Sequence, residues 1–168
     1  MKLENKYQNK LSVTHILSFY CKQIDKILLN LWKTDENIGL YAIGGYGRKE
    51  LFPAADLDIL IISKSNLKPT QESQIKKFLQ NLWDYKLKVS QRVLTLHQCH
   101  QDAITDQAFY TSLLESRCLI GKRFNLINIK IRKNWGDQYL QIKIQERNKR
   151  LQKKPHPLEP DIKQTKGG

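Results

Sequence analysis

The sequence predicts one α/β (α+β) domain with a small sheet, followed by a helical extension. Two observations support this class of fold. Apolar residues recur at helical spacing over residues 11–32 and 71–85. Residues 40–43, 56–62 and 87–96 are short apolar runs typical of strands. The resulting order of helix, strand, turn, strand, helix and strand indicates a compact α/β unit.

Helical patterns dominate the rest of the chain. Four further helices are expected, at residues 97–107, 109–120, 124–131 and 136–154. Gly121 would end the second of these, as glycine often does at a helix C-terminus. We therefore divide the chain into an N-terminal helix that packs on the core (1–36), a core (37–121), a helical extension (122–154) and an irregular tail (155–168).

Composition narrows the class of protein. No apolar run approaches the roughly 20 residues of a membrane helix, and the N-terminus MKLENKYQNK lacks the apolar region of a secretory signal. We therefore expect a cytoplasmic protein without a membrane partner. The net charge of +13 would suit an acidic partner. Lysine outnumbers arginine 22 to 7, which favours compositional drift as the source of most of this charge, since arginine binds phosphate better. In addition, the charge-dense stretch KIQERNKRLQKK contains no aromatic residue for base stacking, so nucleic acid is not the expected partner.

Three cysteines, Cys21, Cys99 and Cys118, are odd in number and widely spaced, so a disulfide framework is not expected. His97 and His100 lie close to Cys99, but no second cluster supplies a full set of four metal ligands. The sequence therefore offers no zinc site of the usual kind.

The stretch LYAIGGYGRKELFPAADLDILII, residues 40–62, carries the chemistry. Asp56 and Asp58 are two residues apart in an apolar strand, so both side chains point to the same face. Leu57 and Ile59 would point the other way, into a core. Two adjacent carboxylates repel each other and are costly to desolvate. A bound Mg²⁺ would remove both penalties, because it prefers oxygen ligands and is shared between carboxylates and substrate phosphates.

The glycines before these aspartates complement such a metal. Gly44 and Gly45 follow a strand, where the backbone can approach a phosphate closely. The amides of Gly45, Tyr46 and Gly47 would open onto one helical turn, expected at residues 48–51 and closed by a proline. Arg48 adds a guanidinium fork for phosphate oxygens.

This combination predicts phosphoryl or nucleotidyl transfer. It is not a Walker A loop, because no Gly-Lys-Ser/Thr follows, and its glycine spacing differs from the dinucleotide fingerprint.

The motif resembles that of the nucleotidyltransferase superfamily that includes DNA polymerase β, in which Gly-Gly or Gly-Ser precedes Asp-x-Asp. More narrowly, it resembles the N-terminal domain of the bifunctional PII uridylyltransferase/uridylyl-removing enzymes, from about residue 39 to 168. The matching segments, in order, are GGYGRKELFPAADLDILII, LWDYKLKV, SLLESRCLIG and LEPDIKQTKGG.

The resemblance implies a small mixed sheet of the polymerase β type. It also implies transfer of UMP from UTP to a tyrosine of the PII nitrogen-regulatory protein. Asp56 and Asp58 would be the catalytic and Mg²⁺-binding residues. The nucleotide-binding residues would be Gly44, Gly45, Tyr46, Gly47 and Arg48.

Several residues depart from the family pattern. Lys88 stands where the superfamily places a third carboxylate, and Gln91 stands where the family has histidine. A lysine there would oppose a catalytic cation or would neutralise the two aspartates. Lys49 replaces a family glycine, and Ala55 replaces a serine. The chain also lacks the His-Asp pair of the family's downstream domain, so we expect a truncated form without uridylyl removal or glutamine sensing.

Three hypotheses remain at this stage. The first is a PII uridylyltransferase domain whose catalytic competence Lys88 puts in question. The second is a non-catalytic fragment of a decayed gene, which retains the loop but not the reaction. The third is a nucleotidyltransferase that acts on RNA, which would be consistent with the net charge of +13.

Overall fold

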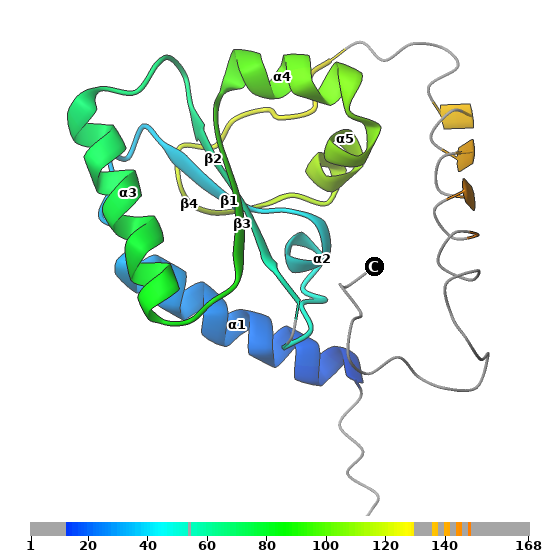
Figure 1. The fold of residues 1–168 in the computed structure, drawn as a ribbon, viewed down its shortest axis with the longest axis horizontal. Coiled ribbons are helices and arrows are strands. Elements are labelled where there is room, and N and C mark those ends of the chain that lie inside the picture. The colour runs from blue at the N-terminus through cyan, green and yellow to red at the C-terminus, as the bar shows by residue number, and fades with distance from the viewer. Residues whose placement is uncertain are drawn as a thin grey trace, which may run out of the picture.

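A computed structural model of the chain describes residues 13–53 and 55–129, together with residues 136, 137, 140, 141, 144, 145 and 148. The elements are arranged around one sheet (Figure 1). In chain order they are α1 (Val13–Leu31), β1 (Gly39–Ala42), α2 (Gly44–Gly47), β2 (Leu57–Ser63), α3 (Pro69–Asp84), β3 (Val89–Thr95), α4 (Leu96–Thr105), α5 (Gln107–Leu114) and β4 (Arg117–Gly121).

The four strands form a mixed sheet in the order β3-β2-β1-β4. Strand β1 is antiparallel to both of its neighbours, whereas β2 and β3 run parallel. A parallel pair needs a crossover connection, and α3 supplies it. The α/β class and the mixed sheet that the sequence predicted are therefore confirmed.

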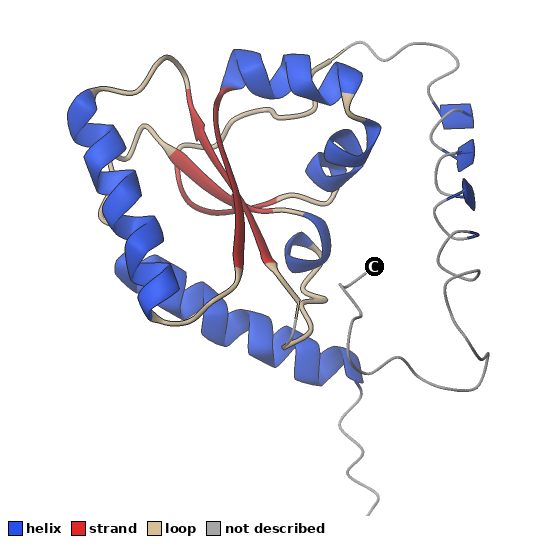
Figure 2. Ribbon diagram, in the orientation of Figure 1, coloured by secondary structure: helices blue, strands red, loops and turns tan. Residues whose placement is uncertain are grey.

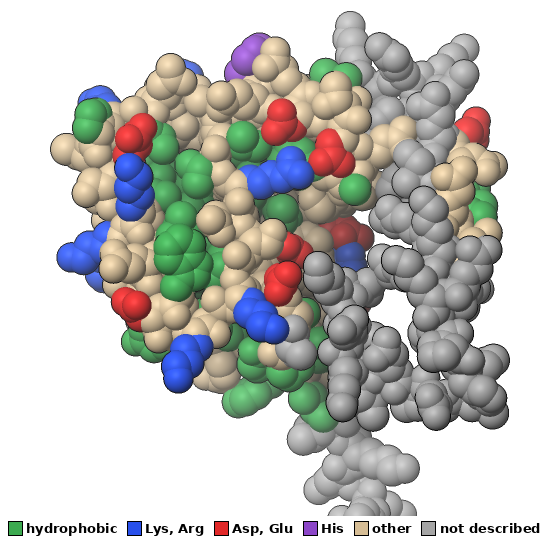
Figure 3. All heavy atoms as spheres, viewed as in Figure 1, with side chains coloured by type: hydrophobic (Ala, Val, Ile, Leu, Met, Phe, Trp, Pro, Cys, Tyr) green, Lys and Arg blue, Asp and Glu red, His purple; other side chains and the backbone are tan. Residues whose placement is uncertain are grey.

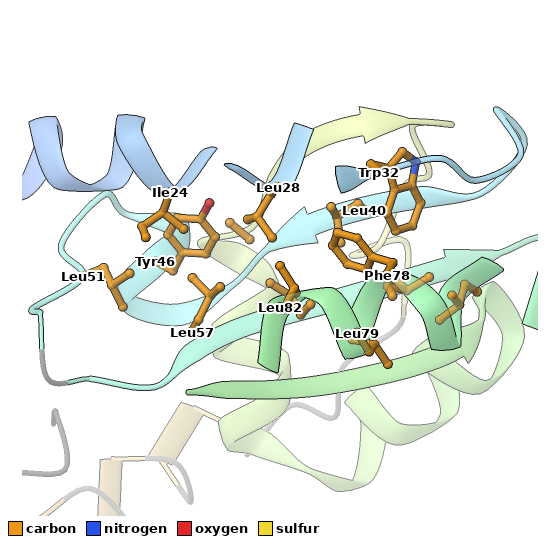
Figure 4. Packing of buried hydrophobic residues seen from close by; sticks show 14 of the residues in the cluster. Ile24, Leu28, Trp32, Leu40, Tyr46, Leu51, Leu57, Phe78, Leu79 and Leu82 are labelled. Carbon is orange, nitrogen blue, oxygen red and sulfur yellow. The ribbon is translucent and has the colours of Figure 1, made fainter. Parts of the chain in front are cut away.

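Helices cover the sheet on both sides (Figure 2). One apolar cluster lies between the sheet and helices α1 and α3, where the rings of Trp32 and Phe78 meet edge-on with centroids 4.9 Å apart (Figure 4). A second cluster lies on the α4 and α5 side and contains Leu60 and Ile62 of β2. Because both faces of β2 are covered, Ile59 through Ile62 have no exposed surface. The central strand is thus a rigid support for whatever its first residues carry.

Most expected elements are confirmed within a few residues, and the C-terminal part of the core differs. The helix expected at residues 109–120 ends at Leu114, and Arg117 begins strand β4. Strand β4 pairs antiparallel with the free edge of β1, with Leu40 opposite Ile120. The apolar residues that looked helical in the sequence are recruited by this long-range pairing, which no local pattern reveals.

The segment after β4 also differs from the prediction. Residues 122–129 form loops and turns rather than a helix. The hydroxyl of Tyr41 accepts a hydrogen bond from the Phe124 amide at 2.6 Å and donates one to the Lys122 carbonyl at 3.1 Å. Leu126 is buried in the second cluster. These contacts hold the segment against the sheet, so its apolar residues serve packing rather than a helical stripe.

Beyond this segment, the helix expected at residues 136–154 is described only in part. The described positions from 136 to 148 are helical and exposed. The other residues of that range, and the expected irregular tail at 155–168, lie outside the described residues. Among the helices that the structure describes, none has the length and apolar character needed to span a bilayer.

Gly121 provides a test of the β4 pairing. Its φ of +83° lies in the left-handed region, and an added Cβ would lie 1.9 Å from the Ile38 carbonyl oxygen. We expect Gly121→Ala to lower the free energy of unfolding by about 2–4 kcal/mol. Urea denaturation measures the change. The control is Gly136→Ala, because no heavy atom lies within 4 Å of that added Cβ. Equal stability of the two variants would contradict the observed β4 geometry.

Candidate active site

The two aspartates flank the beginning of β2. Asp58 is the second residue of the strand and is partly buried, whereas Asp56 precedes the strand and is exposed. Leu57 and Ile59 point into the cluster beneath α1 and α3, as the sequence predicted. Asp58 therefore lies on the opposite side of the sheet, the side that α4 and α5 cover. The strand begins at Leu57, one residue later than expected, so Asp56 belongs to the preceding loop. The strand alternation that predicted a shared face for the two aspartates therefore does not apply to Asp56.

Strand pairing brings Gly44 to Asp58. The amide of Ile43 donates a hydrogen bond to the main-chain carbonyl of Asp58 at 3.1 Å. Gly44 has a φ of +56°, and a Cβ added there would lie 3.5 Å from Oδ2 of Asp58. Glycine thus meets two needs at this position: it adopts the left-handed conformation, and it leaves space beside the carboxylate. The glycine turn and the Asp58 carboxylate therefore lie next to each other.

The helical turn starts at these glycines, four residues earlier than expected. In α2 the amide of Gly47 donates to the Ile43 carbonyl and the amide of Arg48 donates to the Gly44 carbonyl, both at 3.1 Å. The expected turn at residues 48–51 is wrong, because Lys49 adopts a φ of 65° and turns the chain away. The amide of Gly47 is therefore occupied. The preceding amides begin the helix, where no earlier turn supplies an acceptor.

Gly47 also has a packing role. A Cβ at Gly47 would lie 2.2 Å from the Glu115 carbonyl oxygen and 3.1 Å from that of Ala42. Only glycine allows α2 to approach the end of α5 so closely. This contact places the glycine turn against a second element of the fold.

The Arg48 side chain lies beside the turn. Its Nε donates to Glu50 at 2.7 Å, and Nη1 forms a short contact with Glu115. Its Nη2 is 3.9 Å from the position of a Cβ on Gly45. The guanidinium is therefore held next to the glycines while remaining partly exposed. Its donors face two carboxylates, which a phosphate would have to displace or join.

Tyr46 anchors the turn to the rest of the core. Its side chain is 1% exposed and points into the cluster under α1 (Figure 4). The hydroxyl donates to Oδ1 of Asp25 at 2.5 Å, and Arg117 donates to both oxygens of Asp25 at 2.8 and 3.1 Å. The main-chain carbonyl of Tyr46 also accepts hydrogen bonds, from the Lys49 amide at 3.1 Å and from Arg117 at 3.5 Å, so only its amide could face a ligand. Sequence reasoning missed Asp25 and Arg117; the only signal was a carboxylate beside the apolar stripe of α1.

The electrostatic environment of Asp58 raises the pKa of its carboxyl. Burial raises the pKa of the Asp58 carboxyl, the charge of Asp56 raises it further, and a hydrogen bond from Ser90 lowers it. Ser90 is the residue opposite Asp58 in the parallel β2–β3 pair. A divalent cation would favour the ionised form of both aspartates. Within the described residues, no three His, Cys, Asp or Glu side chains form a metal cluster. The pair suits one Mg²⁺ completed by water and phosphate oxygens.

Lys88 lies close to these residues in the sheet. Its carbonyl accepts a hydrogen bond from the Leu57 amide at 2.7 Å, and it lies two residues before Ser90. Alternation along an extended chain therefore places it on the side of Asp58. Its side chain is exposed. Across the described part of the chain, no ion pair within 4.0 Å joins Lys88 to either aspartate. The lysine adds positive charge to this region without neutralising the pair directly.

Comparison with known proteins assigns the class. The family model of the nucleotidyltransferase domain matches residues 21–117, which include the glycine turn, both aspartates and Lys88. The chain belongs to the nucleotidyltransferase family.

The narrower resemblance predicted from the sequence is also confirmed. The chain is 36% identical to the bifunctional uridylyltransferase/uridylyl-removing enzyme of Haemophilus influenzae strain 86-028NP, over 95% of this chain and 20% of that protein. It is 34% identical to the enzyme of the same name from Acinetobacter baylyi, over 99% of this chain and 20% of that protein. The chain thus spans about a fifth of the length of these relatives.

Among solved structures, a toxin–antitoxin crystal structure with AMP-PNP aligns with a TM-score of 0.37 at 11% identity. The alignment covers 76% of this chain and 93% of that chain.

Replacing Asp58 tests whether its charge is costly without a cation. We expect Asp58→Asn to raise the free energy of unfolding by up to about 1 kcal/mol at pH 7, because the amide removes a partly buried charge next to Asp56. Thermal unfolding in the presence of a chelator measures this. The control Asp56→Asn changes an exposed residue and should shift stability by less than about 0.5 kcal/mol. Destabilisation by Asp58→Asn would contradict this account of the site.

Tyr46 gives a pH-dependent prediction. Burial, followed by the hydrogen bond and charge of Asp25, raises the pKa of the Tyr46 hydroxyl above its ordinary value. The unfolded chain therefore ionises first, and stability falls as the pH rises above about 10. We expect Tyr46→Phe to cost about 1–2 kcal/mol near pH 7 and to reduce that fall. Urea denaturation from pH 8 to 11 measures both effects. An unchanged pH dependence would show that Tyr46 does not contribute.

Proposed function

We propose that this chain transfers UMP from UTP to a tyrosine hydroxyl of a PII protein. The observation that carries the proposal is the proximity of Gly44 to Asp58. A Cβ added to Gly44 would lie 3.5 Å from a carboxylate oxygen of Asp58. This is the juxtaposition that a nucleotidyltransferase needs to hold a triphosphate against metal-binding carboxylates. Similarity to enzymes that carry the name uridylyltransferase supports UMP as the group transferred. The PII acceptor comes from the resemblance of the sequence motifs.

In the proposed reaction, the tyrosine oxygen forms a bond to the α-phosphorus of UTP. The bond from that phosphorus to the bridging oxygen breaks, and pyrophosphate leaves. Asp56 and Asp58 would hold Mg²⁺, which supplies charge neutralisation at the phosphates. The glycine turn approaches the triphosphate, and Arg48 contributes guanidinium donors from beside it. The hydroxyl proton passes to solvent, since Lys88 stands where the superfamily has its third acid.

Lys88 also supports a second candidate, which is a domain that binds nucleotide without transferring it. A cationic side chain on the same side of the sheet as Asp58 weakens the field that attracts Mg²⁺. The retained turn and carboxylates would still hold a nucleotide. The two candidates differ in turnover, not in nucleotide binding, so one set of variants separates them.

We expect the purified chain with PII protein, Mg²⁺ and labelled UTP to transfer UMP slowly. Lys88→Glu should raise the rate at saturating UTP and PII by about tenfold or more, because it adds an acid where a cation now stands. Lys64→Glu makes the same charge change at the exposed far end of β2 and should leave the rate unchanged. Gel detection of labelled PII measures the transfer.

Two outcomes would contradict the proposal. Transfer that survives Asp58→Ala would show that the aspartate pair is not the site. Absence of transfer in both the wild type and Lys88→Glu, with UTP binding intact by calorimetry, would favour the nucleotide-binding candidate.

A further inference from the structure

Strand β3 leaves one edge of the sheet open. It is the terminal strand, and among the described elements only β2 pairs with it. Four consecutive residues of β3, from Ser90 to Val93, are exposed. The other terminal strand, β4, has an irregular register against β1 and no such exposed run. In Figure 1, β3 runs between α3 and α5. An unprotected strand edge of this kind is a template for pairing with another chain.

The outward-facing groups of this edge can be identified from two hydrogen bonds. The Lys88 carbonyl is bound to the Leu57 amide of β2, so the main-chain groups of alternate residues from Lys88 onward face β2. The intervening residues face outward. The amide of Thr95 confirms this alternation, because it donates outside the sheet to the Gln98 side chain. The open groups are therefore the N–H and C=O of Val89, Gln91 and Val93.

The surroundings of the edge favour an apolar and acidic peptide. Exposed hydrophobic residues lie at the end of α3, just before the segment that leads into β3, with Trp83 53% and Tyr85 59% exposed. Figure 3 shows hydrophobic side chains on the face that includes α3. Residues 86–93 contain three cationic side chains and no acidic one. Arg92 is paired with Asp106 at 3.1 Å and with Asp102 at 3.9 Å, so the positive charge beside the edge comes from Lys86 and Lys88. The guanidinium of Arg92 is turned back over the Phe109 ring, 4.2 Å from its centroid, so it does not block the edge.

The edge is also aligned with the candidate active site. Ser90 lies opposite Asp58 in the β2–β3 register, and both side chains share one side of the sheet. A strand added outside β3 would lie two strand spacings from β2, roughly 10 Å. A serine hydroxyl on the added strand would stop well short of Asp58. A tyrosine hydroxyl, at the far end of its ring, would cover most of that distance.

We propose that the outer edge of β3 pairs with an extended segment of the acceptor protein and presents its tyrosine to the site beside Asp58. This inference rests on the proposed function, because it assigns the acceptor of the same reaction. Main-chain hydrogen bonds hold the segment, while the apolar and cationic surroundings select an acidic one. The distance across two strands selects tyrosine over serine.

The test compares two substitutions of one exposed residue. Gln91→Pro removes an outward N–H and no β2 hydrogen bond, which an edge strand tolerates. Gln91→Ala keeps that N–H and is the matched control. Binding of PII protein and of UTP with Mg²⁺ is measured separately by calorimetry on the full 168-residue chain. We expect Gln91→Pro to weaken PII binding by about tenfold or more. Gln91→Ala should bind PII like the wild type, and all three chains should bind UTP equally.

Hydrogen exchange of the wild-type chain gives a readout that needs no variant. Addition of PII should slow exchange of the amides of Val89, Gln91 and Val93 while leaving the β2-bonded amides unchanged. The inference is overturned if these amides gain no protection, or if the two variants bind PII equally. It is also overturned if the edge proves to join two copies of this chain, seen as a dimer that Gln91→Pro dissociates without affecting PII binding.

The same measurements separate this inference from the proposed function. A chain that transfers UMP to PII, but whose PII binding is the same in Gln91→Pro and Gln91→Ala, overturns the docking inference alone. A chain that binds PII through the β3 edge but fails to bind UTP supports docking and overturns the proposed transfer reaction.

Discussion

The antiparallel pairing of β1 with β2 is the constraint on which the candidate site depends. It places the end of β1 beside the start of β2, so that the Ile43 amide meets the Asp58 carbonyl. Gly44 then follows immediately and lies against the Asp58 carboxylate. Because β2 is buried on both faces, this end of the strand has little freedom to move. The site is therefore preorganised by the core rather than by its own loop contacts.

The cost of that arrangement is a partly buried carboxylate, Asp58, beside the exposed Asp56. Burial and the neighbouring charge both raise the pKa of Asp58, so its ionised form is disfavoured in the chain alone. The fold compensates on the opposite side of the glycine turn. There Tyr46 and Arg117 both bind Asp25, which ties α2 to α1 and β4. A charged site held by a well-packed polar anchor is a common relation between function and stability in enzymes.

Lys88 and the β3 edge belong to one continuous segment beside the candidate site. Lys88 precedes β3 and adds positive charge on the side of Asp58, which opposes cation binding. The edge that follows exposes the main-chain groups of Val89, Gln91 and Val93. The first two of these residues flank Ser90, which lies opposite Asp58. In the proposed reaction, this one short segment would bear on both metal binding and the choice of acceptor. Its cationic character suits an acidic acceptor even where it disfavours the metal.

The sequence by itself determined the α/β class, the alternation that separates Asp58 from Leu57, and the pairing of a glycine turn with two carboxylates. These follow from local periodicity and from residue chemistry, which act over a few positions. It also revealed Lys88 as a departure from the family, since that comparison needs only aligned motifs.

Only the tertiary structure decided the rest. Strand β4 forms because the edge of β1 is free to accept it, and the helical turn begins at Gly44 because Gly47 can approach the Glu115 carbonyl. The Asp25–Arg117 ion pair joins residues that are distant in sequence. The exposure of the β3 edge likewise depends on strand order. Each of these features arises from contacts between distant segments, whose geometry local patterns do not encode.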